Sequence, residues 1–105
     1  MMEELDPPAL KEALSSELRG VVIDFWSPWC APCRTLKPHL AKLAAEREQK
    51  WRFIAINTEA HPQLATEFAV TALPTVVLLR SGKELHRFTG TPLPSAVRDR
   101  LDEFE

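Results

Sequence analysis

The sequence comprises 105 residues, of which 45% are hydrophobic and 27% are charged, and its formal net charge is −2. This length and composition suit one globular domain around a single core, so we expect one domain over residues 1–105. The weak negative charge gives no basic footprint for nucleic acid or for anionic membranes, and we expect neither as a partner.

The N-terminal residues Met1-Met2-Glu3-Glu4 are acidic, and no apolar stretch of a secretory signal follows them. No apolar run approaches the ~20 residues that a membrane-spanning helix needs. We therefore expect a cytoplasmic protein. In that compartment thiols are kept reduced, and closely spaced cysteines are catalytic or bind metal.

Helices and strands are predicted to alternate along the first half of the chain. The first helix begins at Pro7 and ends at Gly20, with an apolar face that repeats every four residues (Leu10, Leu14 and Leu18). The apolar run 21–26 predicts a buried strand. A second helix is predicted from Cys30, with Pro38 inside it as a kink and an apolar stripe of four residues (Leu36, Leu40, Leu43 and Ala44).

The second half of the chain predicts a similar series of shorter elements. Residues 53–56 form a short apolar strand, and a brief helix follows from Pro62. A second buried strand over 75–79 is joined by a turn at Ser81-Gly82 to a half-exposed strand over 85–88. The last helix is predicted over 94–104.

This order of elements predicts an α/β fold with a small mixed sheet sandwiched between helices in three layers. A strand, a helix and a strand within about thirty-five residues imply a right-handed parallel crossover, and the terminal hairpin adds antiparallel strands. Ligands of such sheets bind at the carboxyl ends of the parallel strands. The two cysteines follow directly on the first buried strand and are therefore expected at that edge.

Cys30 and Cys33 are the only cysteines of the chain. On a helix their side chains lie on one face, roughly 5–6 Å apart, so a small adjustment closes a disulfide. A loop this short gains little stability from a cross-link, so the pair is better suited to chemistry. The alternatives are two inert cysteines or half of a zinc site, but zinc needs two more ligands, and none of the histidines has the required spacing (His39, His61 and His86). We expect no metal site.

Asp24 lies in the middle of the apolar strand before the cysteines. Burial there would raise its pKa above the usual value of about 3.9 and would suit it to accept a proton. The alternative is a hydrated carboxylate at the end of a strand. Trp26 and Trp29 are expected to pack around the cysteines and exclude water.

Together these motifs resemble the thioredoxin family over nearly the whole chain. The resemblance rests on Asp24-Phe25-Trp26, on Trp29-Cys30-Ala31-Pro32-Cys33, on Pro38, on Leu73-Pro74-Thr75, and on Gly82 and Gly90. It implies a thioredoxin fold and a protein-disulfide reductase that is re-reduced by a thioredoxin reductase. It also implies a monomer without a cofactor.

The resemblance also assigns roles to individual residues. Cys30 would be the nucleophile, Cys33 would resolve the mixed disulfide, and Asp24 would accept the proton of Cys33. Pro74 would be a cis proline beside the sulfurs. The implied substrate-binding residues are Trp29, Ala31, Pro32, Leu73, Pro74 and Gly90.

Two residues depart from the family pattern. Ala31 stands where thioredoxins typically have glycine, and Ala55 stands where a lysine usually lies near the buried aspartate, so Asp24 is expected to lack its usual cation. Two other functions therefore stay open: a specialised thioredoxin-like oxidant or isomerase, and a binding module of a larger complex that does not need its cysteines.

Overall fold

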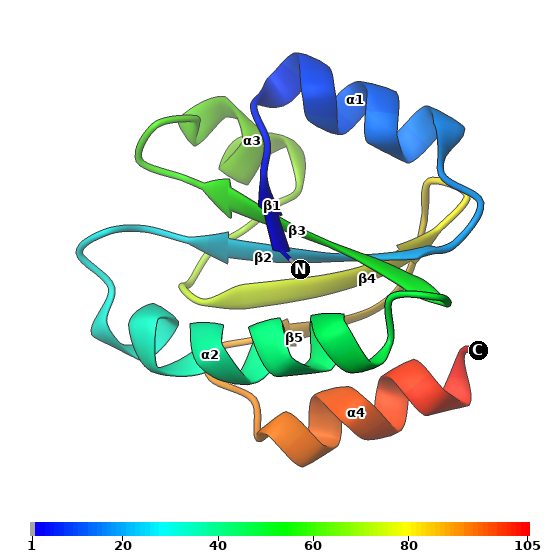
Figure 1. The fold of residues 1–105 in the computed structure, drawn as a ribbon. Helices are drawn as coiled ribbons and strands as arrows, with labels where there is room; N and C mark the ends of the chain where they lie inside the picture. Colours follow the sequence, from blue (N-terminus) through cyan, green and yellow to red (C-terminus); the bar gives the residue numbers. More distant parts are fainter. Residues whose placement is uncertain (1) are drawn as a thin grey trace.

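The computed structural model describes residues 2–105, which form a five-stranded sheet with helices on both faces (Figure 1). In chain order the elements are β1 (Met2–Glu4), α1 (Pro7–Ser16), β2 (Gly20–Trp26), α2 (Ala31–Glu46), β3 (Trp51–Asn57), α3 (Pro62–Glu67), β4 (Thr75–Arg80), β5 (Lys83–Thr89) and α4 (Pro94–Glu103). None of the helices within this part of the chain is long and apolar enough to cross a membrane.

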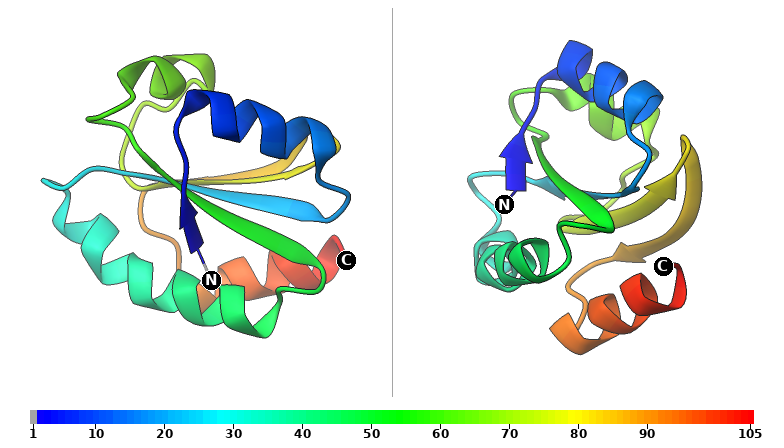
Figure 2. Two further views of the ribbon diagram at one scale, coloured as in Figure 1. Left: turned by 45° about the horizontal axis from the view of Figure 1, so that its top comes forward. Right: turned by 45° about the vertical axis from the view of Figure 1, so that its right-hand side comes forward.

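The strands lie in the order β1-β3-β2-β4-β5. β1, β3 and β2 are parallel, whereas β4 is antiparallel to β2 and β5 is antiparallel to β4. Helices α1 and α3 cover one face, and α2 and α4 cover the other (Figure 2). The expected mixed sheet in a three-layer α/β/α arrangement is confirmed.

Each face of the sheet has its own apolar core. Alternate residues of β2 serve the two cores, because successive side chains of a strand point to opposite faces. Val21, Ile23 and Phe25 pack with α1 and α3, and Val22 packs with α2 and α4. Asp24 therefore faces the layer formed by α2 and α4.

The first helix is shorter than the sequence predicts. It ends at Ser16, and Glu17 is already extended. The Glu17 carboxylate accepts a hydrogen bond from Arg19 Nε at 2.9 Å and lies 3.4 Å from Arg52 Nη1. These bonds draw the chain away from the helix axis and leave Leu18 93% exposed. The prediction that Leu18 continues the apolar face is therefore wrong.

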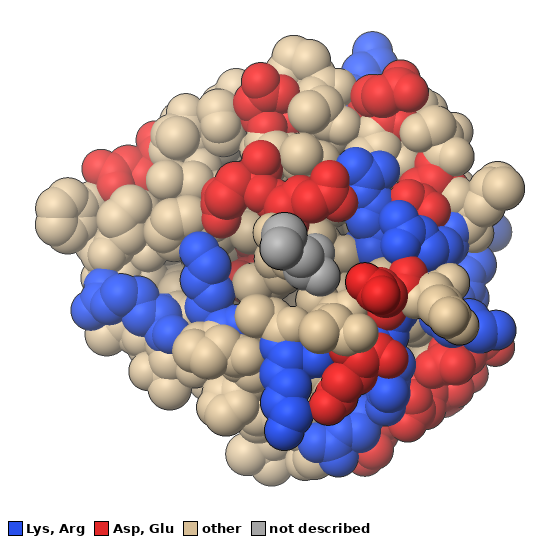
Figure 3. Space-filling model, in the orientation of Figure 1, with Lys and Arg blue, Asp and Glu red and all other residues tan. Residues whose placement is uncertain are grey.

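β1 is an element that the sequence does not predict. Its residues pair in parallel with Phe53, Ile54 and Ala55 of β3 at the edge of the sheet. Glu3 holds this strand in place, since its carboxylate accepts from Arg52 Nε at 2.7 Å. Figure 3 shows acidic and basic side chains intermixed on this side of the molecule.

Candidate active site

The two cysteines occupy the first turn of α2. Cys30 is the N-cap, and its Sγ accepts the backbone N–H of Cys33 at 3.2 Å. A disulfide joins them, with 5.3 Å between the two Cα atoms. Cys33 is 2% exposed, whereas Cys30 is half-buried beside the exposed Ala31 and Pro32. Only the first sulfur is thus open to another molecule, as the expected roles require.

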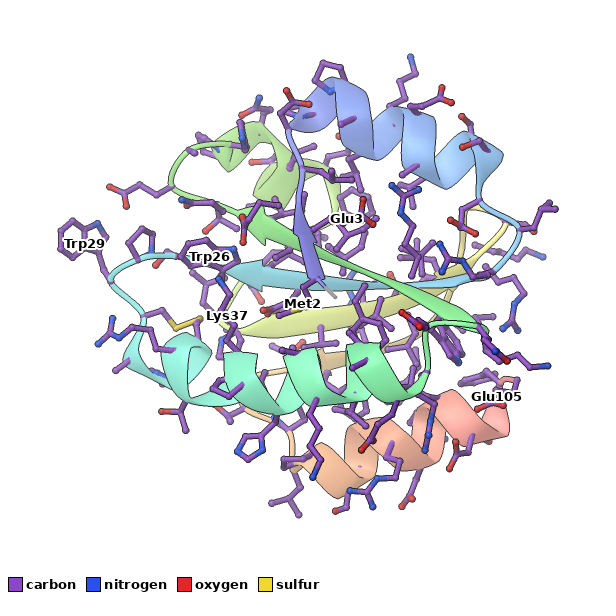
Figure 4. The ribbon with its side chains drawn as sticks, viewed as in Figure 1. Met2, Glu3, Trp26, Trp29, Lys37 and Glu105 are labelled. Carbon is purple, nitrogen blue, oxygen red and sulfur yellow. A yellow bond between two sulfur atoms is a disulfide. The ribbon has the colours of Figure 1, made fainter. Side chains whose placement is uncertain are left out.

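The loop between β2 and α2 is fixed by hydrogen bonds to its backbone carbonyls. The N–H of Cys30 donates to the carbonyl of Ser27 at 3.2 Å, and Arg34 Nη1 donates to the carbonyl of Pro28 at 2.8 Å. This closed loop turns Trp29 outward, and the residue is 80% exposed (Figure 4). The expectation that Trp29 packs around the cysteines is wrong, whereas Trp26 is half-buried.

Asp24 is 1% exposed, and neither of its carboxylate oxygens has a hydrogen-bond partner among the described residues. Asp24 is therefore not a solvent-exposed carboxylate at the end of a strand. Burial raises the pKa of Asp24 from its ordinary value of 3.8 to about 7; the attraction of Lys37 opposes this rise, and the repulsion of Glu4 adds to it. A carboxyl group with such a pKa can bind and release a proton near neutral pH, as a general base must.

The segment before β4 forms a second side of the site. The Leu73–Pro74 peptide bond is cis, in agreement with the family resemblance. Phe25 pairs with Thr75, so Pro74 lies at the sheet edge from which the cysteine loop leaves. Gly90 donates its N–H to the carbonyl of Pro74 at 2.9 Å, and its φ of +88° favours glycine. Leu73 is half-buried and Pro74 is buried at this edge.

Two charged residues that the sequence does not single out lie at the same edge. Lys37 Nζ is 4.6 Å from the centroid of the Trp26 ring and 3.6 Å from Glu4 Oε2. The usual cation of Asp24 is absent, as expected from Ala55, but a different cation acts on the carboxylate. Ala55 is indeed beside Asp24, but the cation comes from α2. The spacing of four residues between Cys33 and Lys37 is the signal that could have found it.

Comparison with known proteins agrees with this geometry. The family model described as Thioredoxin matches residues 2–103. A relative named "Thioredoxin" from Porphyra purpurea is 31% identical over 94 residues, which cover 90% of this chain and 87% of the relative.

Two solved yeast structures are also similar, each covering 97% of this chain and 94% of the other, with a TM-score of 0.86. One is oxidised mitochondrial thioredoxin 3 of Saccharomyces cerevisiae, at 29% identity. The other, at 28% identity, concerns the thiol resolving mechanism in yeast mitochondrial 1-Cys peroxiredoxin via glutathione/thioredoxin systems.

Proposed function

The chain belongs to the thioredoxin family, and we propose that it takes electrons from a thioredoxin reductase and passes them to the disulfides of client proteins. Family and redox-active pair together make it a thiol-disulfide oxidoreductase with protein-disulfide reductase activity. The proposal concerns the source of the electrons, their recipients and the roles of single residues.

The observation that carries the proposal is the unequal exposure of the two linked sulfurs. A helix N-terminus favours thiolate over thiol, which activates Cys30. Cys33 is buried within the first turn of α2, the helix that covers the face of the sheet on which Asp24 lies. An accessible nucleophile backed by a protected second thiol and a base is suited to a two-step exchange.

In the first step, the Cys30 thiolate attacks one sulfur of a client disulfide. A Cys30–client bond forms, and the second client sulfur leaves with the electron pair of the broken bond. In the second step, the Cys33 proton moves to the Asp24 carboxylate, and the Cys33 thiolate attacks Cys30 Sγ. The Cys30–client bond breaks, the client sulfur takes its electron pair and later a proton from water, and the disulfide between the two cysteines re-forms.

Docking would bring an extended client segment against the exposed Trp29 and the edge at Leu73 and Pro74. Apolar and aromatic surface favours protein clients over small solutes, because the large contact area supplies the binding free energy. Since the similar yeast structure concerns a peroxiredoxin, an oxidised peroxiredoxin is a suitable first client. A cytoplasmic location and a monomeric state stay predictions of the sequence.

The proposal is tested with reduced protein and insulin, followed by turbidity, and then with NADPH and a thioredoxin reductase, followed by absorbance. We expect turnover in both assays, and none from Cys30→Ser. Cys33→Ser should instead trap a mixed disulfide that mass spectrometry locates on Cys30. If the protein reduced insulin with dithiothreitol as electron donor but with none of the thioredoxin reductases tested, the proposal that a thioredoxin reductase supplies its electrons would be wrong.

A measured reduction potential separates the remaining alternatives. A reduction potential of about −270 mV, as in thioredoxins, would support a reductant. A potential of about −120 mV, as in strong oxidants, would support an oxidase. A binding module would keep its function in the double variant that lacks both thiols.

A further inference from the structure

The two strands that flank Asp24, β3 and β4, place no charged residue directly beside it. On its two sides in the sheet lie Ala55 of β3 and Val76 of β4, and α4 contributes Val97 and Leu101 to the same layer. An ionised carboxylate surrounded in this way is strongly disfavoured unless a cation approaches from another element. The cation has to come from the open side of the layer.

Helix α2 provides that cation. Lys37 follows Cys33 by four residues and so lies on the same face of the helix, one turn further from the sulfurs. The ammonium group of Lys37 is 4.6 Å from the centroid of the Trp26 ring. Trp26 follows Asp24 by two residues in β2, so both side chains lie on the same face of the sheet. Figure 4 shows Lys37 and Trp26 side by side at the edge of the sheet. Lys37 thus lies at the edge of the layer that contains Asp24, and the Lys37 side chain is 46% exposed.

Glu4 of β1 fixes this arrangement. One oxygen of its carboxylate is 3.6 Å from Lys37 Nζ, and the other accepts a hydrogen bond from Trp26 Nε1 at 3.3 Å. A single side chain therefore holds both the ammonium group and the indole ring. Three elements, β1, β2 and α2, meet over Asp24 through this cluster of Glu4, Trp26 and Lys37.

The two charges of the cluster act on Asp24 in opposite directions. Lys37 lowers the pKa of Asp24, and Glu4 raises it, both against the larger effect of burial, which raises it. Lys37 and Glu4 are the charged groups that act on Asp24, and Cys33, buried on α2, is the thiol whose proton Asp24 would receive in the proposed second step. The charge on the cluster therefore adjusts the fraction of Asp24 that is ionised and able to take a proton, within the limit set by burial.

We propose that Lys37, held against Trp26 by Glu4, is a positioning residue that increases the ionised fraction of Asp24 and so favours proton transfer from Cys33. The inference deepens the proposed function and rests on its second step. When the Cys33 proton moves to Asp24, the carboxyl becomes neutral, and it returns the proton to water before the next cycle. The described contacts of Lys37 are with Trp26 and Glu4, and in this proposal it acts through Asp24.

The test follows the Asp24 carboxyl carbon by NMR across pH in the oxidised protein, where the cysteines do not titrate. We expect Lys37→Gln to move the titration midpoint upward by about a few tenths to one pH unit, as for a half-exposed charge partner. Glu4→Gln should move it downward, and Lys37→Arg should leave it near the wild-type value. Lys42→Gln is the matched control, since Lys42 is exposed on the same helix.

A second measurement links the titration to catalysis. The pH dependence of insulin reduction should shift with the Asp24 midpoint, so that Lys37→Gln loses about two- to tenfold in rate on the acid side of the profile and Lys37→Arg restores it. An Asp24 midpoint in Lys37→Gln that equals that of Lys42→Gln would overturn the role of Lys37 and leave the reductase function intact. A wild-type protein that turns over no disulfide would instead overturn the proposed function.

Discussion

Replacing Asp24 with asparagine is expected to stabilise the folded protein at neutral pH and to slow disulfide turnover. Asparagine has nearly the same size but never ionises, so the folded chain no longer carries a buried charge. The gain in stability and the loss of the proton acceptor have one cause, and they should appear together.

The sign follows from the raised pKa. Below pH 3.8 the carboxyl is protonated in the folded and the unfolded chain, and the substitution changes little. Between pH 3.8 and about 7 the unfolded chain releases the proton while the folded chain keeps it, so the stability of the wild type falls as pH rises. Above about pH 7 both are ionised, and the loss is complete.

The magnitude follows from the same two values. The pKa rises from 3.8 to about 7, and each unit of pKa difference corresponds to about 1.4 kcal/mol, so full ionisation of Asp24 costs the fold at most about 4 kcal/mol. Asparagine still buries polar atoms without partners, which reduces the expected gain to about 2–4 kcal/mol. With a denaturant dependence of about 2 kcal/mol/M, the urea midpoint should rise by about 1–2 M.

Urea unfolding of the oxidised proteins at several pH values checks this prediction. Asp24→Asn and the wild type should unfold at similar urea concentrations near pH 4 and should separate progressively up to about pH 8. Asp99→Asn is the control, because Asp99 is exposed on α4, and it should follow the wild type. If the difference between the urea midpoints of Asp24→Asn and the wild type did not change with pH over this range, the buried-charge reasoning would be refuted. It would also be refuted if Asp24→Asn were the less stable protein at about pH 8.

Three further outcomes are expected. Iodoacetamide should label Cys30 of the reduced protein before Cys33, as peptide mapping can show, because Cys33 is 2% exposed; preferential labelling of Cys33 would reverse the assigned roles. Gly20→Ala should lower stability by about 1–3 kcal/mol in urea unfolding, because a Cβ there would lie closer than 3.0 Å to the ring of Trp51; an unchanged midpoint would mean that the ring can move. Two arginines lower the pKa of Glu17 from 4.5 to about 2, so Glu17→Gln should cost about 1–2 kcal/mol at neutral pH. That cost should disappear as pH falls from 4.5 to about 2, where the wild type loses the same stabilisation; a cost that is independent of pH would point to packing alone.

Local patterns predicted the central part of the fold well. Strand β2 begins and ends within one residue of the predicted run, and α2 begins one residue after Cys30. In both segments the apolar periodicity, the cap and the prolines all favour one conformation. The family motifs likewise predicted the disulfide and the cis bond before Pro74.

What the sequence missed depends on contacts between distant residues. β1 has three residues and no alternating pattern, and it exists as a strand because β3 pairs with it. The position of Glu4 beside Lys37 depends on that pairing, so the charge near Asp24 could not be predicted from Ala55 alone. Leu18 is exposed because Glu17 finds arginine partners outside the helix, and helix propensity does not contain that information.

Hydrophobic character also failed to predict the environment of Trp29, since hydrogen bonds of the loop backbone decide where its ring points. The outward ring gives the molecule an optical signal at its reactive edge. Trp29 is 80% exposed, whereas Trp51 is 1% exposed, so iodide in solution can quench the fluorescence of the first indole and hardly reaches the second. An aromatic side chain can bury about 150–250 Å², and a docked client would cover part of this area on Trp29. The emission of Trp29 would then move to shorter wavelength, because water leaves the ring. Client binding can therefore be followed by light emission from the native protein, separately from the exchange of electrons and without an attached dye.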